Sequence, residues 1–205
     1  MKQMEPAVIF IHGYNKKLEY WNKNEFGKEI NIEKTISKKS YTLLIQIDNF
    51  EINPAIGIIP IIEQMKLVKN KNWIIVCHSL GVIYGLELLK HDIKIVGMCL
   101  IDPTSLDEIY IKELIDDNWM DIANYCSTEK YNPSSKIIFH THFDYNQNDV
   151  NNVDYFNRQI KFYGKFINKN NKSKIIIHPN KGHMIHYTDS PKIINSISDL
   201  IEWCF

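Results

Sequence analysis

Arginine is almost absent from this sequence of 205 residues, because Arg158 is the only one and lysine supplies the other basic side chains. Bidentate recognition of phosphate or carboxylate by arginine is therefore not expected. An excess of one charge is lacking too, since 24 basic residues balance 24 acidic residues and the formal net charge is zero. A neutral chain does not attract the phosphate backbone, so the composition excludes nucleic acid as the main partner.

Long hydrophobic runs are also missing. The longest ones, such as Ala7–Ile11 and Ile58–Ile62, are far shorter than the roughly 20 residues that a membrane-spanning helix needs. No CxxC spacing occurs among the cysteines, which indicates reduced thiols in an intracellular protein. These cysteines lie at positions 77, 99, 126 and 204. We therefore expect a soluble, cytoplasmic protein without a membrane span.

The sequence does contain a regular alternation of short apolar runs and longer helix-like segments. The apolar runs predict strands at Ala7–Ile11, Tyr41–Ile47, Trp73–Cys77, Ile95–Ile101, Lys136–His140 and Lys174–His178. Helices are predicted at Ile56–Val68, Val82–Lys90, Leu106–Tyr125, Val153–Ile167 and Pro191–Trp203. Because the strands are apolar on both faces, they should lie between two helical layers. The predicted fold is α/β: a single domain (1–205), built as a three-layer sandwich around a mostly parallel, doubly wound sheet of about six strands.

The strongest local motif is Cys77-His78-Ser79-Leu80-Gly81, which follows a predicted strand and precedes a predicted helix. A serine at such an abrupt turn adopts a strained conformation that exposes its oxygen above the sheet. The residues two positions before and after it must be small, because strand and helix approach closely there. Gly81 meets this condition, and Cys77 is a small substitute for the usual glycine. The motif predicts that Ser79 is a nucleophile.

A serine hydroxyl needs a base, and the base needs a carboxylate that orients it. His183 follows Gly182 just after the last predicted strand, where its loop would lie over Ser79. Asp144 follows the predicted strand Lys136–His140. The order Ser79, Asp144, His183 leaves room for a strand–helix unit between successive members. All three side chains can therefore meet at the carboxyl edge of one sheet.

Several other residues remain alternatives for these two roles. His178 and His186 flank His183, but His178 ends a strand and His186 lacks a preceding glycine. Asp149 shares the loop of Asp144, and Asp102 ends the strand Ile95–Ile101. We assign the base to His183 and the acid to Asp144, with Asp102 as the next candidate.

The first predicted strand ends in Ile11-His12-Gly13-Tyr14. This turn could aim the backbone amide of Tyr14 at the same point as the amide of Leu80, which would form an oxyanion hole with two donors. His12 is expected to bond within its own loop. Together with the serine motif, Asp144 and Gly182-His183, this turn resembles the α/β-hydrolase superfamily.

The resemblance covers nearly the whole chain and implies a nucleophile, an acid and a base at Ser79, Asp144 and His183. It implies a serine hydrolase that cleaves esters of small molecules and needs no cofactor. A carboxylesterase or small lipase is the first expectation and a thioesterase the second, and a non-catalytic binding protein is the alternative of a different class. Only segment 103–135 leaves room for a small lid.

One competing motif suggests a metal site. His140-Thr141-His142-Phe143-Asp144 has the H-x-H-x-D form of di-metal hydrolases, and strand alternation would place both histidines on one face. That arrangement would leave the serine turn without a use. We therefore predict no metal, and the same segment becomes a strand that leads to the triad acid.

Overall fold

The structure, a computed structural model, describes residues 5–13, 16–48, 51, 53–69, 71–103, 135–143, 153, 156–161, 164 and 173–203. These residues form a sheet of six strands in the order β2-β1-β3-β4-β5-β6, and every neighbouring pair is parallel. The strands are β1 (Glu5–Ile11), β2 (Tyr41–Ile45), β3 (Lys71–His78), β4 (Ile95–Ile101), β5 (Lys136–Phe143) and β6 (Lys174–Pro179). Each strand coincides with a predicted one, which confirms the parallel sheet.

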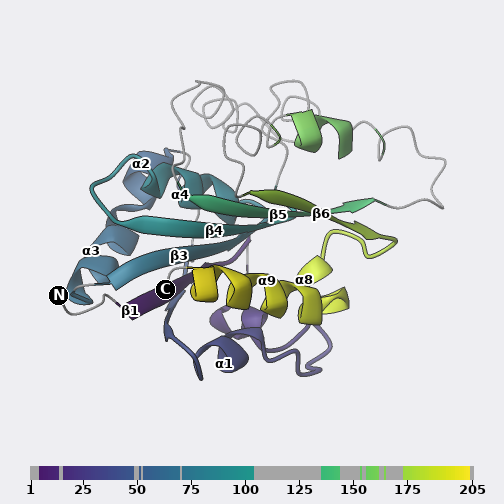
Figure 1. Cartoon of the computed structure of the whole chain (residues 1–205), viewed down its shortest axis with the longest axis horizontal. Coiled ribbons are helices and arrows are strands. Elements are labelled where there is room, and N and C mark those ends of the chain that lie inside the picture. The colour runs from purple at the N-terminus through teal and green to yellow at the C-terminus, as the bar shows by residue number, and fades with distance from the viewer. Residues whose placement is uncertain are drawn as a thin grey trace.

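Helices cover both faces of this sheet (Figure 1). One face carries α2 (Pro54–Gly57), α3 (Ile59–Leu67) and α4 (Gly81–Leu88). The other carries the 3-10 helix η1 (Leu18–Trp21), α1 (Ile32–Ile36), α8 (Ile185–Thr188) and α9 (Ser190–Trp203). The sandwich of three layers is therefore as predicted. None of the helices in these described ranges is long and apolar enough to cross a membrane.

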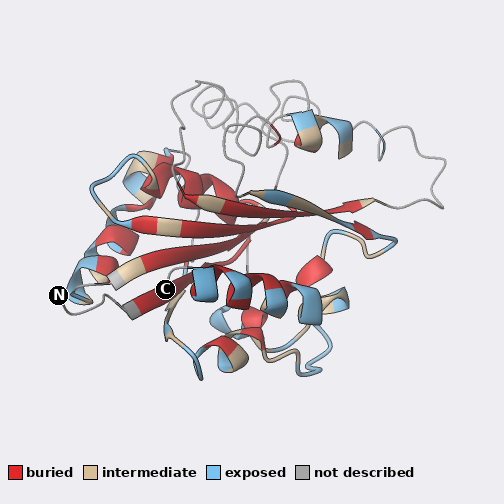
Figure 2. Ribbon diagram, viewed as in Figure 1, coloured by how far each residue is buried: buried red, intermediate tan, exposed pale blue. Residues whose placement is uncertain are grey.

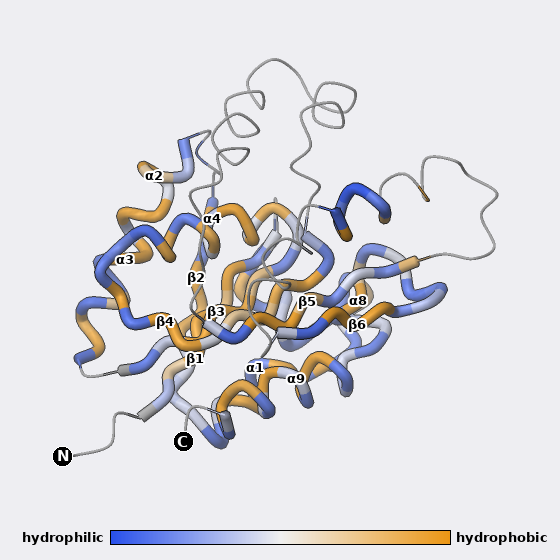
Figure 3. Tube along the Cα trace, turned by 45° about the horizontal axis from the view of Figure 1, so that its top comes forward, coloured by the Kyte–Doolittle hydropathy of each residue, from blue (hydrophilic) through white to orange (hydrophobic). Residues whose placement is uncertain are grey.

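The core consists of the two faces of the strands, each packed against one helical layer. In β1, Ile9 and Ile11 belong to the cluster under α2–α4, whereas Val8 and Phe10 belong to the cluster under α9. Figure 2 shows the consequence, because the central strands β1, β3, β4 and β5 are buried along most of their length, whereas the edge strands β2 and β6 are more exposed. Helix α4 is buried throughout, and α9 is buried on one side only. In Figure 3, which is coloured by hydropathy, hydrophobic residues are likewise concentrated along the strands and on the helices that pack on them. Apolarity on both faces of a strand thus reflects burial on both sides.

Strand order determines where a site can form. The chain passes from β1 to β2 on one side of β1 and then returns to place β3 on the other side. In open parallel sheets the crevice lies at such a reversal, outside the carboxyl ends of the strands. Those ends carry Gly13 after β1 and Ser79 after β3. The topology alone therefore brings the serine motif and the turn after β1 together.

Three short elements were not predicted: η1, α1 and α8. Their four or five residues are too few to show a helical period. The predicted helix Ile56–Val68 is divided into α2 and α3, with Pro60 near the start of the second. The predicted helix Leu106–Tyr125 and most of the possible lid 103–135 lie outside the described residues.

Candidate active site

Ser79 lies on a sharp turn between β3 and α4. Its φ of 52° is in the left-handed region, which a residue with a side chain adopts at a cost of about 1–3 kcal/mol. Its backbone N–H donates to the carbonyl of Ile101 at 3.0 Å, so the turn is attached to the end of β4. The predicted strained turn is therefore present.

Close backbone packing explains the small residue at Gly81. A Cβ there would lie 2.8 Å from the carbonyl oxygen of Ile11 and closer still to that of His12. The first helical residue thus lies directly against the end of β1. Cys77 replaces the usual glycine because Gly85 of α4 makes room for it, since a Cβ on Gly85 would overlap the Cys77 sulfur. The motif and this glycine therefore form one packing unit.

His183 is in contact with the predicted nucleophile. Its Nε2 lies 3.0 Å from Ser79 Oγ, although the two residues are 104 positions apart in the sequence. The imidazole lies in the loop between β6 and α8 and is 42% exposed. Gly182 has a φ of 64°, so the turn before His183 uses a conformation that glycine adopts without strain. His183 is thus placed where a general base would act.

The carboxylate on the other ring nitrogen belongs to Asp102. Asp102 Oδ2 accepts a hydrogen bond from His183 Nδ1, and its side chain is completely buried. The sequence analysis gave this contact to Asp144 and named Asp102 as the next candidate. Asp144 and Asp149 lie outside the described residues. In the described structure, Asp102 occupies the position next to His183 that the sequence analysis assigned to Asp144.

A second histidine binds the same carboxylate, and the sequence analysis did not assign it this contact. His142 Nδ1 lies 2.8 Å from Asp102 Oδ2, and the His142 backbone N–H donates to Oδ1 at 3.2 Å. Burial raises the pKa of Asp102, but the hydrogen bonds from His142 and His183 outweigh it and bring the pKa below its usual value. Asp102 is therefore an ionised carboxylate inside the protein, held by these donors and by a longer contact from Thr141 Oγ1 at 3.5 Å.

These contacts define the tautomer of each imidazole. An ionised carboxylate only accepts hydrogen bonds, so both Nδ1 atoms around Asp102 carry protons. A neutral His183 then has its lone pair on Nε2, which faces the Ser79 hydroxyl at 3.0 Å. This is the tautomer that can take the proton of Ser79.

His78 connects the serine turn to the loop that carries His183. Its Nε2 lies 3.0 Å from the carbonyl oxygen of His183, and its Nδ1 lies 2.6 Å from the Tyr20 hydroxyl. Burial lowers the pKa of His78 well below its usual value, so the ring is neutral. Since a carbonyl only accepts, Nε2 must donate and Nδ1 must accept from Tyr20. A directed chain thus runs from Tyr20 through His78 to the backbone of His183.

The predicted oxyanion donors are only partly described. Leu80 is the residue before α4, where backbone N–H groups lack partners within the helix. Gly13 lies against the nucleophile, because a Cβ on it would be 3.1 Å from Ser79 Cβ. Tyr14 lies outside the described residues, so its role stays a prediction. His12 bonds to the carbonyl of Gly13 at 2.7 Å, within its own loop as expected, and accepts from the Ile47 N–H at 3.0 Å.

The histidines of the competing metal motif have different partners. His140 Nδ1 lies 2.8 Å from His178 Nε2, whereas His142 binds Asp102. His178 in turn bonds to Asp189 at 2.9 Å, and His186 is buried among aromatic rings. The described part of the chain therefore does not bring His140 and His142 to one site. Neither His178 nor His186 competes with His183 as the base in contact with Ser79.

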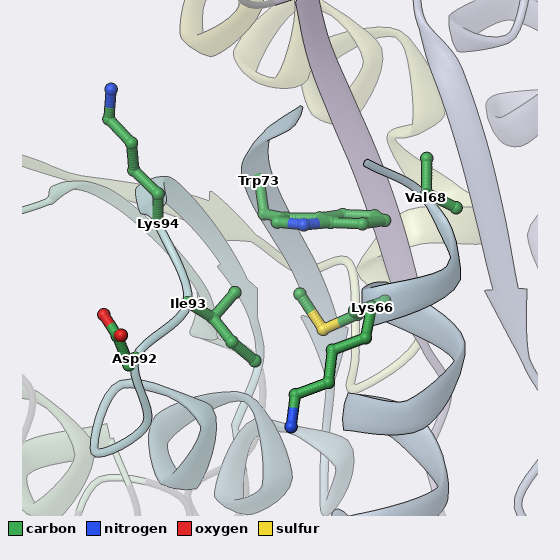
Figure 4. A pocket seen from close by; sticks show the side chains of 7 residues that line it. Lys66, Val68, Trp73, Asp92, Ile93 and Lys94 are labelled. Carbon is green, nitrogen blue, oxygen red and sulfur yellow. The ribbon is translucent and has the colours of Figure 1, made fainter. Parts of the chain in front are cut away.

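A hollow of about 180 Å³ lies near the amino end of β3, away from Ser79. Trp73, Met65 and Ile93 provide its apolar wall, while Lys66 and Lys94 lie at its rim (Figure 4). Ser79 follows the opposite end of the same strand. This hollow is therefore not the place where a substrate would meet Ser79.

Comparison with known proteins finds matches among solved structures but none by sequence. No family model matches the sequence, and no curated protein matches it either. Solved structures do match over nearly the full length. An epoxide hydrolase from Vigna radiata has a TM-score of 0.65 at 11% identity, covering 98% of this chain and 92% of its own.

Two further structures agree with this match. A thermophilic esterase from Thermogutta terrifontis has a TM-score of 0.64 at 9% identity, over 98% of this chain and 91% of its own. An alpha/beta hydrolase fold protein from Burkholderia ambifaria has a TM-score of 0.61 at 11% identity, over 95% and 90%. At such low identity the likeness establishes the fold and leaves the activity open. The chain therefore has the α/β-hydrolase fold, as its sequence motifs predict.

Proposed function

We propose that this protein is a serine hydrolase that cleaves carboxylic esters through an acyl-enzyme on Ser79. The observation that carries the proposal is the line of contacts from Ser79 Oγ to His183 Nε2 at 3.0 Å and from His183 Nδ1 to the buried Asp102. A hydroxyl, a neutral imidazole and an ionised carboxylate in this order form an activated nucleophile. Asp102 takes the role that the sequence analysis assigned to Asp144.

The first half of the reaction forms the acyl-enzyme. Ser79 Oγ attacks the ester carbonyl while its proton passes to His183 Nε2, and the carbonyl oxygen becomes an oxyanion. The amides of Leu80 and Tyr14 would hold that oxyanion. The imidazolium of His183 is stabilised by Asp102, and it then gives the proton to the departing alcohol. The carbon–oxygen bond to the alcohol breaks as the carbonyl forms again.

The second half returns the free enzyme. Water loses a proton to His183 Nε2 and attacks the acyl carbon, and collapse of the intermediate releases the acid and restores the Ser79 hydroxyl. Apart from the substrate and this water, these steps use side chains and backbone groups of the chain. Neutral charge and a single arginine favour a substrate that is recognised by its carbonyl and apolar body. The fold does not determine the substrate. We therefore propose the ester class, whose hydrolysis is the activity with the simplest test.

Hydrolysis of p-nitrophenyl esters of increasing acyl length tests this function. We expect turnover by the wild type and a fall in kcat of about 10⁶-fold in Ser79→Ala, as for loss of a triad serine. Ser37→Ala is the matched control, because Ser37 lies at the exposed end of α1 and should leave the rate unchanged. Equal rates for wild type and Ser79→Ala would refute the proposal. A folded wild type that hydrolyses none of these esters would favour a binding protein.

A further inference from the structure

Three potential metal ligands converge beside the proposed nucleophile. Asp102, His142 and His183 each offer one ligand atom, and these atoms lie within 4.8 Å of one another. Two imidazole nitrogens and one carboxylate oxygen are a donor set that suits Zn²⁺, with water in the fourth position. The proposed triad supplies only Asp102 and His183, and His142 adds the third ligand.

An ion can enter if the loop of His183 moves outward, because His183 Nδ1 lies closer to Asp102 Oδ2 than two ligands of one zinc would. His142 Nδ1 lies 2.8 Å from Asp102 Oδ2, whereas ligands about 2.0–2.1 Å from a tetrahedral zinc are roughly 3.3 Å apart. Asp102 and His142 are fixed, because one is completely buried and the other is on β5 with 10% of its side chain exposed. His183 is in a loop and is 42% exposed. An ion can therefore approach from solvent beside His183.

We propose that Asp102, His142 and His183 form an inhibitory site for Zn²⁺ and similar divalent transition metals. Binding of zinc at this site does not depend on the proposed ester hydrolysis. The proposed inhibition does rest on that function. The proposal differs from the H-x-H-x-D motif, because it uses His142 without His140 and uses Asp102 in place of Asp144. It also differs from metal catalysis, because the ion would block the base.

Inhibition follows from the position of one proton. In the metal-free protein His183 carries its proton on Nδ1, and the Nε2 lone pair faces Ser79 Oγ. Zinc needs the lone pair of Nδ1 in both imidazoles, so in His183 and in His142 the Nδ1–H bond breaks and an Nε2–H bond forms in the same neutral ring. Ser79 then faces an N–H donor, and no base remains to take its proton. Removing the ion restores the first tautomer.

Zinc titration of the full-length protein, after treatment with EDTA, tests the site. Isothermal calorimetry should show one Zn²⁺ bound by the wild type and by Ser79→Ala, with no binding of Mg²⁺. In His142→Asn the amide nitrogen can still donate to Asp102 but carries no lone pair. The Kd for Zn²⁺ should therefore rise at least about tenfold in that variant. A thermal melt checks that it folds, and His142→Gln provides a second variant if it does not.

His178→Asn is the control for the other histidine cluster. His178 contacts both His140 and Asp189, so zinc bound there would be lost in this variant. We expect it to bind zinc as the wild type does. Equal affinity of wild type and His142→Asn, or loss of binding in His178→Asn alone, would overturn the proposed site.

Activity then tests inhibition separately from binding. Zinc at saturation should stop p-nitrophenyl ester hydrolysis by the wild type, and EDTA should restore it. His142→Asn, compared with its own metal-free rate, should need at least about tenfold more zinc. A wild type that binds zinc through His142 but keeps its full rate would refute inhibition. Binding through His142 in a protein that hydrolyses no ester would support the site and count against the proposed function.

Discussion

Asp102 is a charged group without exposed surface, and its charge depends on the hydrogen bonds that its carboxylate accepts. The imidazoles of His142 and His183 both reach Oδ2, and the His142 backbone N–H reaches Oδ1. A buried charge without such partners would cost several kcal/mol. The same contacts orient the His183 ring toward Ser79. The Asp102 carboxylate therefore stabilises the local structure and also orients the proposed base, His183.

Asp102→Asn should separate the two candidates for the triad acid. An asparagine can donate to His183 Nδ1 and so favours the wrong tautomer, which places a proton on Nε2. We expect kcat for ester hydrolysis to fall about 10⁴-fold, with little change in KM. Asp144→Asn should have almost the wild-type rate. The reverse result would return the role to Asp144, and steady-state kinetics on one ester distinguishes the two.

The sequence located the proposed nucleophile and base, whereas for the carboxylate beside His183 it favoured Asp144 and named Asp102 next, and the reason is geometric. Ser79 and His183 have local signals, which are a strand–turn–helix pattern and a glycine before the histidine. The acid has no such signal, because β4 and β5 are adjacent and their carboxyl ends are only about 5 Å apart. An aspartate after either strand could reach the same imidazole. Register and side-chain direction decide between them, and these require the structure.

At the level of elements, the short helix η1 contacts the residues that surround the proposed base. Its residues Tyr20 and Trp21 are buried, and the Tyr20 ring packs on His78 and His186. Through the Tyr20 hydroxyl this short helix connects to the loop of His183. The sequence could not reveal the connection, because the partners are far apart in the chain and meet only through tertiary packing.

Tyr20→Phe tests that connection. The variant keeps the ring but leaves His78 Nδ1 as a buried acceptor without its donor, which should lower the free energy of unfolding by about 1–3 kcal/mol. Because His78 also holds the His183 carbonyl, kcat should fall while KM stays the same. Urea unfolding and steady-state kinetics measure the two effects.

Tyr187→Phe is the matched control. Its ring contacts Tyr20 and His186 in the same cluster, but its hydroxyl makes no hydrogen bond to any residue that the structure describes. It should change kcat less than Tyr20→Phe does. Equal effects of the two variants would show that only ring packing matters and that the chain through His78 does not position the base.

Across the whole molecule, several buried imidazoles make stability depend on pH. Burial lowers the pKa of His78 and His186 well below the usual value and that of His140 to about 3. In the unfolded chain these rings titrate near pH 6.5. Below that pH the unfolded state binds more protons than the folded state, so stability falls as pH decreases.

We therefore expect the free energy of unfolding to fall steadily from about pH 6.5 downward. Its slope should reach at least about 4 kcal/mol per pH unit, because these three imidazoles each contribute about 1.4 kcal/mol. His12 and His178, whose pKa values burial also lowers, add to it. Below about pH 4, Asp102 adds to this fall, because its lowered pKa means that the carboxyl binds a proton in the unfolded chain before it does so in the folded protein. Urea unfolding at a series of pH values measures the slope. A free energy that stays constant between pH 7 and 5 would contradict the account.

His186→Phe supplies the control for this slope. Within the described part of the chain neither ring nitrogen of His186 has a hydrogen-bond partner, and the ring lies against Tyr20, Trp21 and Tyr187. Phenylalanine should be tolerated there, and the slope should decrease by about 1.4 kcal/mol per pH unit. The free energy of unfolding of His186→Phe should therefore exceed that of the wild type by an amount that grows as pH decreases.

Most of the fold was predictable, since strands buried on both faces carry a strong signal and parallel pairing follows from their alternation with helices. The short elements were not predictable, and neither was the network under the base. In this chain the proposed reactive residues follow from local patterns, whereas the groups that contact them lie at the end of β4, on β5 and on η1. Their contacts arise only when the sheet is assembled.

Covalent labelling of Ser79 by a fluorophosphonate, followed by mass spectrometry, tests the proposed activated serine most directly. We predict one label per chain, located on the peptide that contains Ser79 and absent in Ser79→Ala. Labelling should be much slower in His183→Asn, because the base is lost while the fold is kept. A folded wild type that takes up no label, or a label on a different serine, would contradict the proposed mechanism.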